Sequence, residues 1–206
     1  MVAYLIEKGA DVNGSAEGKF GNAPLYLAVV LGDPEMAKLL IMKGADVNGM
    51  WGEPALQRAV RDGNLTLVML LVENGADVRV MSQRGTPLHD ALDYPIAKLL
   101  ISKGADVNAR DSGGNVPLHY TRSIVISGLL VASGADVNAR NDEGNTPLHE
   151  ALERGKEWSL IKFLIEHGAD VNARNGEGMT PLGLIRAKKG IPPEHGRLIE
   201  EYGGHE

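Results

Sequence analysis

The sequence contains no cysteine and few aromatic residues. Without thiols, disulfide bonds and thiolate metal sites are excluded, and a reducing compartment such as the cytoplasm fits the composition. Aromatic residues make up 4% of the 206 residues while hydrophobic residues make up 43%, so leucine, isoleucine, valine and alanine must form the core. Small aliphatic side chains of this kind suit many thin repeated layers better than one large globule.

Long apolar runs and an excess of basic charge are also missing. No stretch approaches the roughly 18 apolar residues of a membrane-spanning helix, and the first residues have too short an apolar run for a signal peptide. The net charge of −6 argues against the concentrated basic face of a non-specific nucleic-acid binder. We therefore expect a cytoplasmic protein with neither a membrane nor a nucleic acid as its partner.

Two short motifs alternate along the whole chain. The string Gly-Ala-Asp-Val-Asn or its variant begins at Gly9, Gly44, Gly75, Gly104, Gly134 and Gly168. Strings similar to Thr-Pro-Leu-His lie between them and begin at Ala23, Thr86, Val116, Thr146 and Thr180, with a decayed copy around Pro54. Successive copies of the second motif are 30 to 34 residues apart, which is the signature of a repeat protein.

One repeat shows why the motifs recur. Thr146 is a helix cap followed by Pro147 at the first helical position, where the missing N–H costs nothing. A second apolar stripe at helical spacing runs to Gly168, a residue suited to the left-handed end of a helix. A single helix pair cannot bury its own apolar face, so neighbouring repeats must cover it.

These paired motifs resemble the ankyrin-repeat family. The resemblance implies an all-α repeat solenoid, in which helix-turn-helix units joined by β-hairpin fingers form a curved stack. It also implies protein binding through the finger tips and the first helix of each pair, on the concave face. We expect one domain over residues 1–206, with a partial repeat at 1–13, repeats near 22–48, 53–79, 85–108, 115–138 and 145–172, and a capping repeat at 179–206.

Some repeats depart from the common length. Pro87 to Gly104 and Pro117 to Gly134 each span 17 residues, against 20 for Pro24 to Gly44, so we expect a recess where the two helices of a short pair meet. The first repeat has only its second helix, at residues 2–6. Either the natural protein continues upstream, or a partner or second copy covers this flank, which would make a homodimer through residues 1–13.

The histidines invite a catalytic or metal site, but their positions favour structure. His89, His119 and His149 each occupy the fourth position of their motif, in separate layers, and the resemblance implies hydrogen bonds within and between repeats. No catalytic, phosphate-binding or dinucleotide-binding motif is present. We therefore expect no enzyme activity, no cofactor and no metal site.

Candidate binding residues differ between repeats yet lie on fingers or first helices. Two adjacent fingers carry Lys19-Phe20 and Met50-Trp51, and one first helix ends in Val30-Leu31 where the next has Arg61-Asp62. Exposed aromatic residues at finger tips are typical of interface hot spots. The alternative is that Phe20 folds back onto the N-terminal helix. The full predicted footprint is Lys19, Phe20, Val30, Leu31, Met50, Trp51, Arg61, Asp62, Arg84, Asp142 and Glu143.

Three arginines recur two residues after the asparagine of their repeats, at Arg110, Arg140 and Arg174. We expect a ladder along three fingers that pairs with acidic tips such as Asp142 and Glu143, or alternatively recognises an acidic partner. The sequence therefore predicts a module that binds another protein. The alternative is structural self-assembly through the uncapped first repeat.

Overall fold

The computed structural model describes residues 6, 8–14, 23–49, 53–155, 157–187 and 193–205. Its backbone divides into two compact units, the first made of residues 1–82 and 86–105 and the second of residues 83–85 and 106–206. Both units consist of stacked helix pairs, so the all-α repeat solenoid is confirmed.

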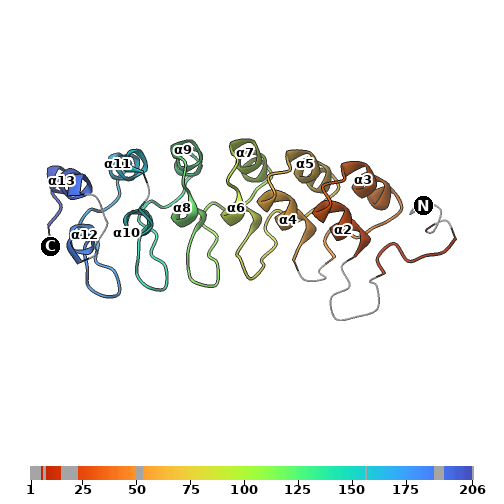
Figure 1. The fold of residues 1–206 in the computed structure, drawn as a ribbon, viewed down its shortest axis with the longest axis horizontal. Helices are drawn as coiled ribbons and strands as arrows, with labels where there is room; N and C mark the ends of the chain where they lie inside the picture. Colours follow the sequence, from red (N-terminus) through yellow and green to blue (C-terminus); the bar gives the residue numbers. More distant parts are fainter. Residues whose placement is uncertain are drawn as a thin grey trace. The chain divides into compact units, whose positions relative to one another are not determined.

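The first unit contains three helix pairs. Their bounds are α2 (Pro24–Val30) with α3 (Pro34–Met42), α4 (Ala55–Arg61) with α5 (Leu65–Glu73), and α6 (Pro87–Asp90) with α7 (Tyr94–Ser102). The first helices α2, α4 and α6 pack side by side as one layer, and the second helices α3, α5 and α7 form the other (Figure 1).

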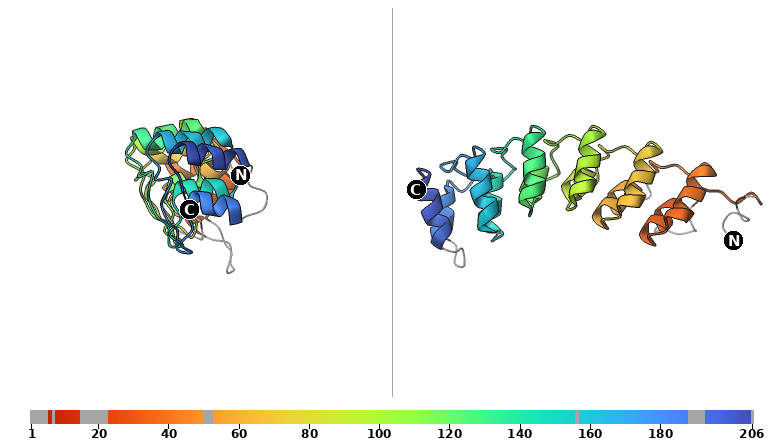
Figure 2. Two further views of the ribbon diagram at one scale, coloured as in Figure 1. Left: turned by 90° about the vertical axis from the view of Figure 1, so that its left-hand side faces the viewer. Right: turned by 90° about the horizontal axis from the view of Figure 1, so that it is seen from above.

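The second unit repeats this arrangement. It contains α8 (Pro117–Tyr120) with α9 (Ile124–Ala132), α10 (Pro147–Glu153) with α11 (Trp158–Glu166), and α12 (Pro181–Ala187) with α13 (Pro193–Glu201). Within this unit the second helices α9, α11 and α13 lie next to one another in chain order (Figure 2). Consecutive repeats are therefore spatial neighbours, which brings residues about thirty positions apart into contact.

Helices begin where the sequence places capping residues. Pro147 occupies the first turn of α10, and the Thr146 hydroxyl accepts a hydrogen bond from the backbone N–H of the third helical residue at 3.5 Å. In the second helices, the side chains of Asp33 and Asn64 accept from the corresponding N–H groups at 2.9 and 3.1 Å. At the other end, Gly168 follows α11 with a φ of +91°, which favours glycine.

The core consists of aliphatic side chains between the layers. Leu160, Ile161 and Leu164 on α11 are almost completely buried, as are Leu67 and Leu71 on α5. Burial contributes about 1.5–3 kcal/mol for each such side chain. The short repeats differ in their first helices: α6 and α8 have four residues each, whereas α2, α4 and α10 have seven. The residues that these repeats lack therefore come from the last turn of the first helix.

The loops between helix pairs are turns. Over the described residues, only Ser82 and Gly85 form isolated β-bridges and no longer strand occurs, so the β-hairpin form of the fingers stays a prediction. In the second unit each finger is closed by a backbone bond, as from the Asn141 N–H to the Asn145 carbonyl at 3.0 Å. No helix in the described part of the chain is long and apolar enough to cross a membrane.

Candidate binding surface

Asparagine side chains tie successive repeats together at the base of the fingers. Asn138 Nδ2 donates to the Gly168 carbonyl at 2.9 Å, and its Oδ1 accepts from the Asp170 N–H at 2.7 Å. Asn108 makes the same two bonds one repeat earlier, to Gly134 and Asp136. The recurrent asparagines are thus structural, as repetition at every unit predicts.

In one repeat of the first unit, arginine replaces this asparagine. Arg79 Nε donates to the Gly104 carbonyl at 2.7 Å and so keeps the donor half of the bridge. A guanidinium has no acceptor atom, so Arg79 cannot accept a hydrogen bond from a backbone N–H of the next repeat as the asparagine Oδ1 does.

The motif histidines also have structural roles. His149 Nδ1 accepts from the Thr146 N–H at 3.3 Å, and its Nε2–H donates to the Met179 carbonyl of the next repeat at 3.1 Å. His119 makes the matching bond to the Asn145 carbonyl at 3.1 Å. Burial lowers the pKa of His149, which keeps the imidazole neutral and its Nδ1 an acceptor. The hydrogen bonds expected within and between repeats are confirmed for these two residues.

A buried carboxylate organises one finger of the second unit. Glu150 on α10 is 7% exposed, and its Oε1 accepts from Asn141 Nδ2 at 3.4 Å and Asn145 Nδ2 at 3.3 Å. Its Oε2 pairs with Arg154 Nε at 2.8 Å. A buried charge requires such partners, so Glu150 holds two finger residues against the first helix. The sequence does not predict this network, because it joins positions that no motif links.

Tyr120 forms a second polar link in this unit. Its hydroxyl donates to Asp111 Oδ2 at the start of a finger, and Asn115 Nδ2 donates to the Tyr120 oxygen at 3.2 Å. Burial, followed by the bond to the Asp111 carboxylate, raises the pKa of Tyr120 to about 12. The Arg154 guanidinium lies over the Tyr120 ring, 5.3 Å from its centroid.

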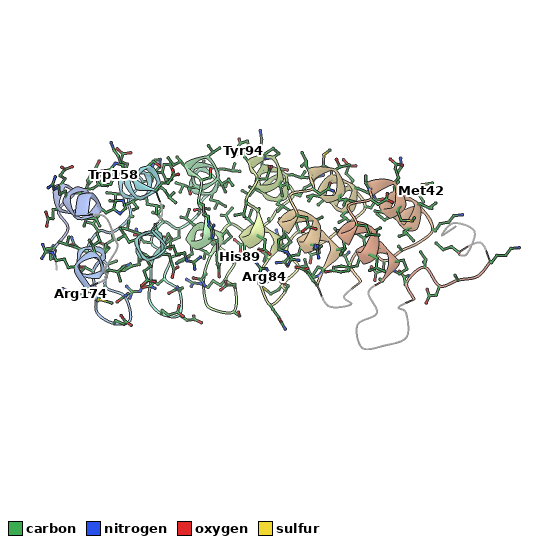
Figure 3. All side chains as sticks on the ribbon, in the orientation of Figure 1. Met42, Arg84, His89, Tyr94, Trp158 and Arg174 are labelled. Carbon is green, nitrogen blue, oxygen red and sulfur yellow. The ribbon has the colours of Figure 1, made fainter. Side chains whose placement is uncertain are left out.

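The arginine ladder is present, but its partners differ from the expectation. Arg110 donates to the Arg140 carbonyl at 2.6 Å, and Arg140 donates to the Arg174 carbonyl at 2.5 Å. Among the described residues these side chains bind backbone carbonyls of the next finger, and the predicted pairing of Arg110 and Arg140 with acidic tips is wrong. Backbone carbonyls are fixed in place by the fingers, whereas the exposed tip side chains Asp142 and Glu143 are not held by these arginines. Figure 3 labels Arg174 on the finger before α12.

Apolar side chains are exposed along α2. Leu31 is 80% exposed and Leu27, one turn earlier, is 46% exposed, while Val30 between them is partly buried. Leu25, Ala28 and Val29 on the same helix are buried, so the exposed leucines form the outer stripe. Val30 and Leu31 were predicted from the sequence but Leu27 was not, although the i, i+4 spacing of Leu27 to Leu31 is the signal that identifies it.

The neighbouring helix α4 presents charges at this surface. Arg61 forms a two-pronged ion pair with Glu53, to which the Tyr26 hydroxyl also donates at 3.1 Å. Asp62 pairs with Arg58 at 2.6 Å. The two predicted binding residues Arg61 and Asp62 are therefore exposed but already paired within the first unit.

The remaining predicted binding residues divide into two groups. Arg84, Asp142 and Glu143 are exposed on finger loops. Four residues, Lys19, Phe20, Met50 and Trp51, lie outside the described residues, and their role stays a prediction. No group of three or more potential metal ligands occurs among the residues with described positions.

Comparison with known proteins agrees with this arrangement. A family model of ankyrin repeats in three copies matches residues 49–111 and 122–190, and a single ankyrin repeat matches residues 20–49. The chain belongs to the ankyrin-repeat family. Ankyrin repeats generally mediate protein–protein interaction and form a non-catalytic module.

Individual ankyrin relatives match only part of the chain. An ankyrin repeat protein of Fowlpox virus is 34% identical over 120 residues, which cover 54% of this chain and 35% of the viral protein. An ankyrin repeat protein of Rickettsia felis is 40% identical over 125 residues, which cover 53% of this chain and 55% of the bacterial protein. Human protein phosphatase 1 regulatory subunit 27 is 49% identical over 69 residues, which cover 32% of this chain and 45% of the human protein. The chain thus spans between a third and just over half of these relatives' lengths.

Proposed function

We propose that this ankyrin-repeat chain binds another protein through a surface that includes the exposed stripe of α2. The observation that carries the proposal is the 80% exposure of Leu31 next to the 46% exposure of Leu27. At corresponding places, α4 and α10 end in charged residues, Arg61 with Asp62 and Glu153 with Arg154. Apolar side chains exposed together, rather than singly, are typical of interaction surfaces.

The finger residues predicted from the sequence extend this surface in the proposal. Phe20 and Trp51 belong to the fingers on either side of α2 and α3 in the chain, and Trp is enriched at interface centres. Arg84, Asp142 and Glu143, which are exposed on finger loops of the second unit, are further candidate contact residues. The match to a phosphatase regulatory subunit supports a protein partner in general, and a phosphatase is one candidate. The cytoplasmic location and the absence of catalysis stay predictions.

A capture experiment tests the proposal. The wild type and a Leu27→Ser, Leu31→Ser double variant are immobilised and exposed to extract of the source cell. Met42→Ser serves as the matched control, because Met42 is 75% exposed on the second helix α3 of the same unit (Figure 3). We expect a protein retained by the wild type and by Met42→Ser to be lost from the double variant. Equal retention by all three proteins would remove the α2 stripe from the proposal.

Self-assembly through residues 1–13 is the alternative function. Sedimentation from micromolar to near-millimolar concentration tests it, because an assembling chain gains mass with concentration. A constant monomer mass excludes this alternative, whereas a mass that rises and reverts on deletion of residues 1–13 supports it.

A further inference from the structure

The second unit contains a recess where two helix turns meet. Its volume is about 330 Å³, and it is lined by Arg122, Arg154, Gly155 and Glu157. Arg122 lies in the connection between α8 and α9, and the other three lie in the connection between α10 and α11. None of these residues belongs to the α2 stripe or to the finger tips.

The recess exists because α8 is short. Helix α8 ends at Tyr120 after four residues, while its neighbour α10 continues for seven. The last turn of α10 therefore has no partner turn in α8, and the Arg154 side chain borders open space. A Cβ atom placed on Gly155 would meet no heavy atom within 4 Å, which confirms that this edge is open.

Arg154 is held in a fixed orientation at the recess. Its Nε pairs with Glu150 Oε2 at 2.8 Å, and the face of its guanidinium lies over the Tyr120 ring. Glu150 is itself fixed by Asn141 and Asn145. An arginine whose rotamer is already restricted loses less conformational entropy when a ligand binds to its other nitrogens.

Arg122 supplies a second cation at the recess. Its side chain is exposed and forms neither an ion pair nor a hydrogen bond with any residue that the structure describes. The chain as a whole carries a net charge of −6, so two arginines that line one recess are a local exception. Glu157 lines the same recess, and the Ser159 hydroxyl donates to its Oε2 at 3.5 Å.

We propose that this recess binds an acidic side chain, aspartate or glutamate, presented by an exposed segment of a partner protein. Planar guanidinium groups bind carboxylates through paired N–H···O bonds, and two of them border one small opening here. The proposal rests on the proposed protein-binding function and adds the chemistry that the partner offers.

Peptide titration followed by NMR tests this site directly. The probe is acetyl-Gly-Glu-Gly-amide, with acetyl-Gly-Gln-Gly-amide as its neutral match, and the readout is the Nε–Hε signals of Arg122 and Arg154. We expect saturable shifts of both signals with the glutamate peptide and none with the glutamine peptide. The Arg122→Gln variant should weaken binding about tenfold or more, as the loss of one charge-assisted contact predicts.

Arg197→Gln is the matched control, because Arg197 is an exposed arginine on α13 of the same unit and its replacement changes the net charge equally. It should alter peptide affinity less than about twofold. Equal responses to both peptides, equal weakening by both variants, or no shift at millimolar peptide would overturn the proposal. The outcome is independent of the capture experiment: peptide binding at Arg122 can fail while capture through Leu31 succeeds, and the reverse.

Discussion

Asn138 and Asp170 are 32 positions apart in the chain, yet the Asp170 N–H donates a 2.7 Å hydrogen bond to Asn138 Oδ1. The same asparagine donates to the Gly168 carbonyl, so one side chain forms hydrogen bonds with two backbone groups, a carbonyl and an N–H, that would otherwise bind water. The motif asparagine thus couples neighbouring layers in addition to shaping its own turn.

Replacing Asn138 by alanine should lower the free energy of unfolding by about 1–2 kcal/mol, because two inter-repeat hydrogen bonds are lost. Urea denaturation monitored by circular dichroism measures the change. Asn74→Ala is the control, since Asn74 is exposed and, among the described residues, its side chain bonds to Leu70 of its own repeat at 2.7 Å. The control should cost less than half as much, and equal costs would show that Asn138 does not couple repeats.

Leu164→Ala should destabilise the chain by about 2–5 kcal/mol, because Leu164 is 1% exposed and its truncation leaves a cavity between the helix layers. Leu31→Ala removes the same atoms from a side chain that is 80% exposed and should cost less than about 0.5 kcal/mol. Guanidinium denaturation of both variants tests the pair. A cost above about 1 kcal/mol for Leu31→Ala would mean that the α2 stripe is packed and not free for a partner.

Acid should weaken the fold through His149. Burial lowers the pKa of His149 in the folded state, so the unfolded chain binds a proton more readily. The contribution of His149 to stability is therefore complete above the unfolded pKa of about 6.5 and is lost as the pH falls below it.

The variant His149→Gln lacks the titratable imidazole. Glutamine already occupies the matching motif position in another repeat, as the buried Gln57 in α4. Between pH 7.5 and 5.5 the variant should lose less unfolding free energy than the wild type, by at most about 1.4 kcal/mol per pH unit. Urea titrations at three pH values measure the difference. Identical pH dependence in both proteins would contradict the assignment.

Two effects make glycine necessary in the connections between helix pairs: a left-handed backbone conformation, and the close approach of a neighbouring finger. Gly144 has a φ of +74°, and a Cβ there would lie 2.7 Å from the backbone nitrogen of Gly176 in the next finger. Gly168 has a φ of +91° but no heavy atom within 4 Å of that position. Both alanine variants carry the left-handed backbone cost of about 1–2 kcal/mol, and only Gly144→Ala also separates two fingers.

Gly144→Ala should therefore lower the thermal midpoint by several degrees more than Gly168→Ala does. It should also increase amide exchange at Gly176, whose N–H donates to the Glu143 carbonyl at 2.7 Å. If both variants melt together and exchange alike, the fingers do not depend on this close approach.

Much of the fold follows from local sequence signals. The proline at the first turn of α10, the side-chain caps of Asp33 and Asn64, and the left-handed glycine after α11 act within a few residues, so a sequence shows them directly. The candidate surface was predicted less completely. Val30 and Leu31 were found by comparing repeats, but Leu27 was missed, and Arg110 and Arg140 were given the wrong partners.

The repeat unit, its register and the family follow from the sequence alone, because a motif that recurs every thirty-odd residues specifies the same local helix pair each time. The three-dimensional packing determined which polar side chains meet, as Glu150 on α10 meets Asn141 and Asn145 of the preceding finger. It also decided that the shortening falls on α8, which opens the recess between Arg122 and Arg154. The spacing of the motifs shows how many residues a short repeat lacks. The packing of the helices determines which helical turn is absent and which neighbouring side chains are exposed as a result.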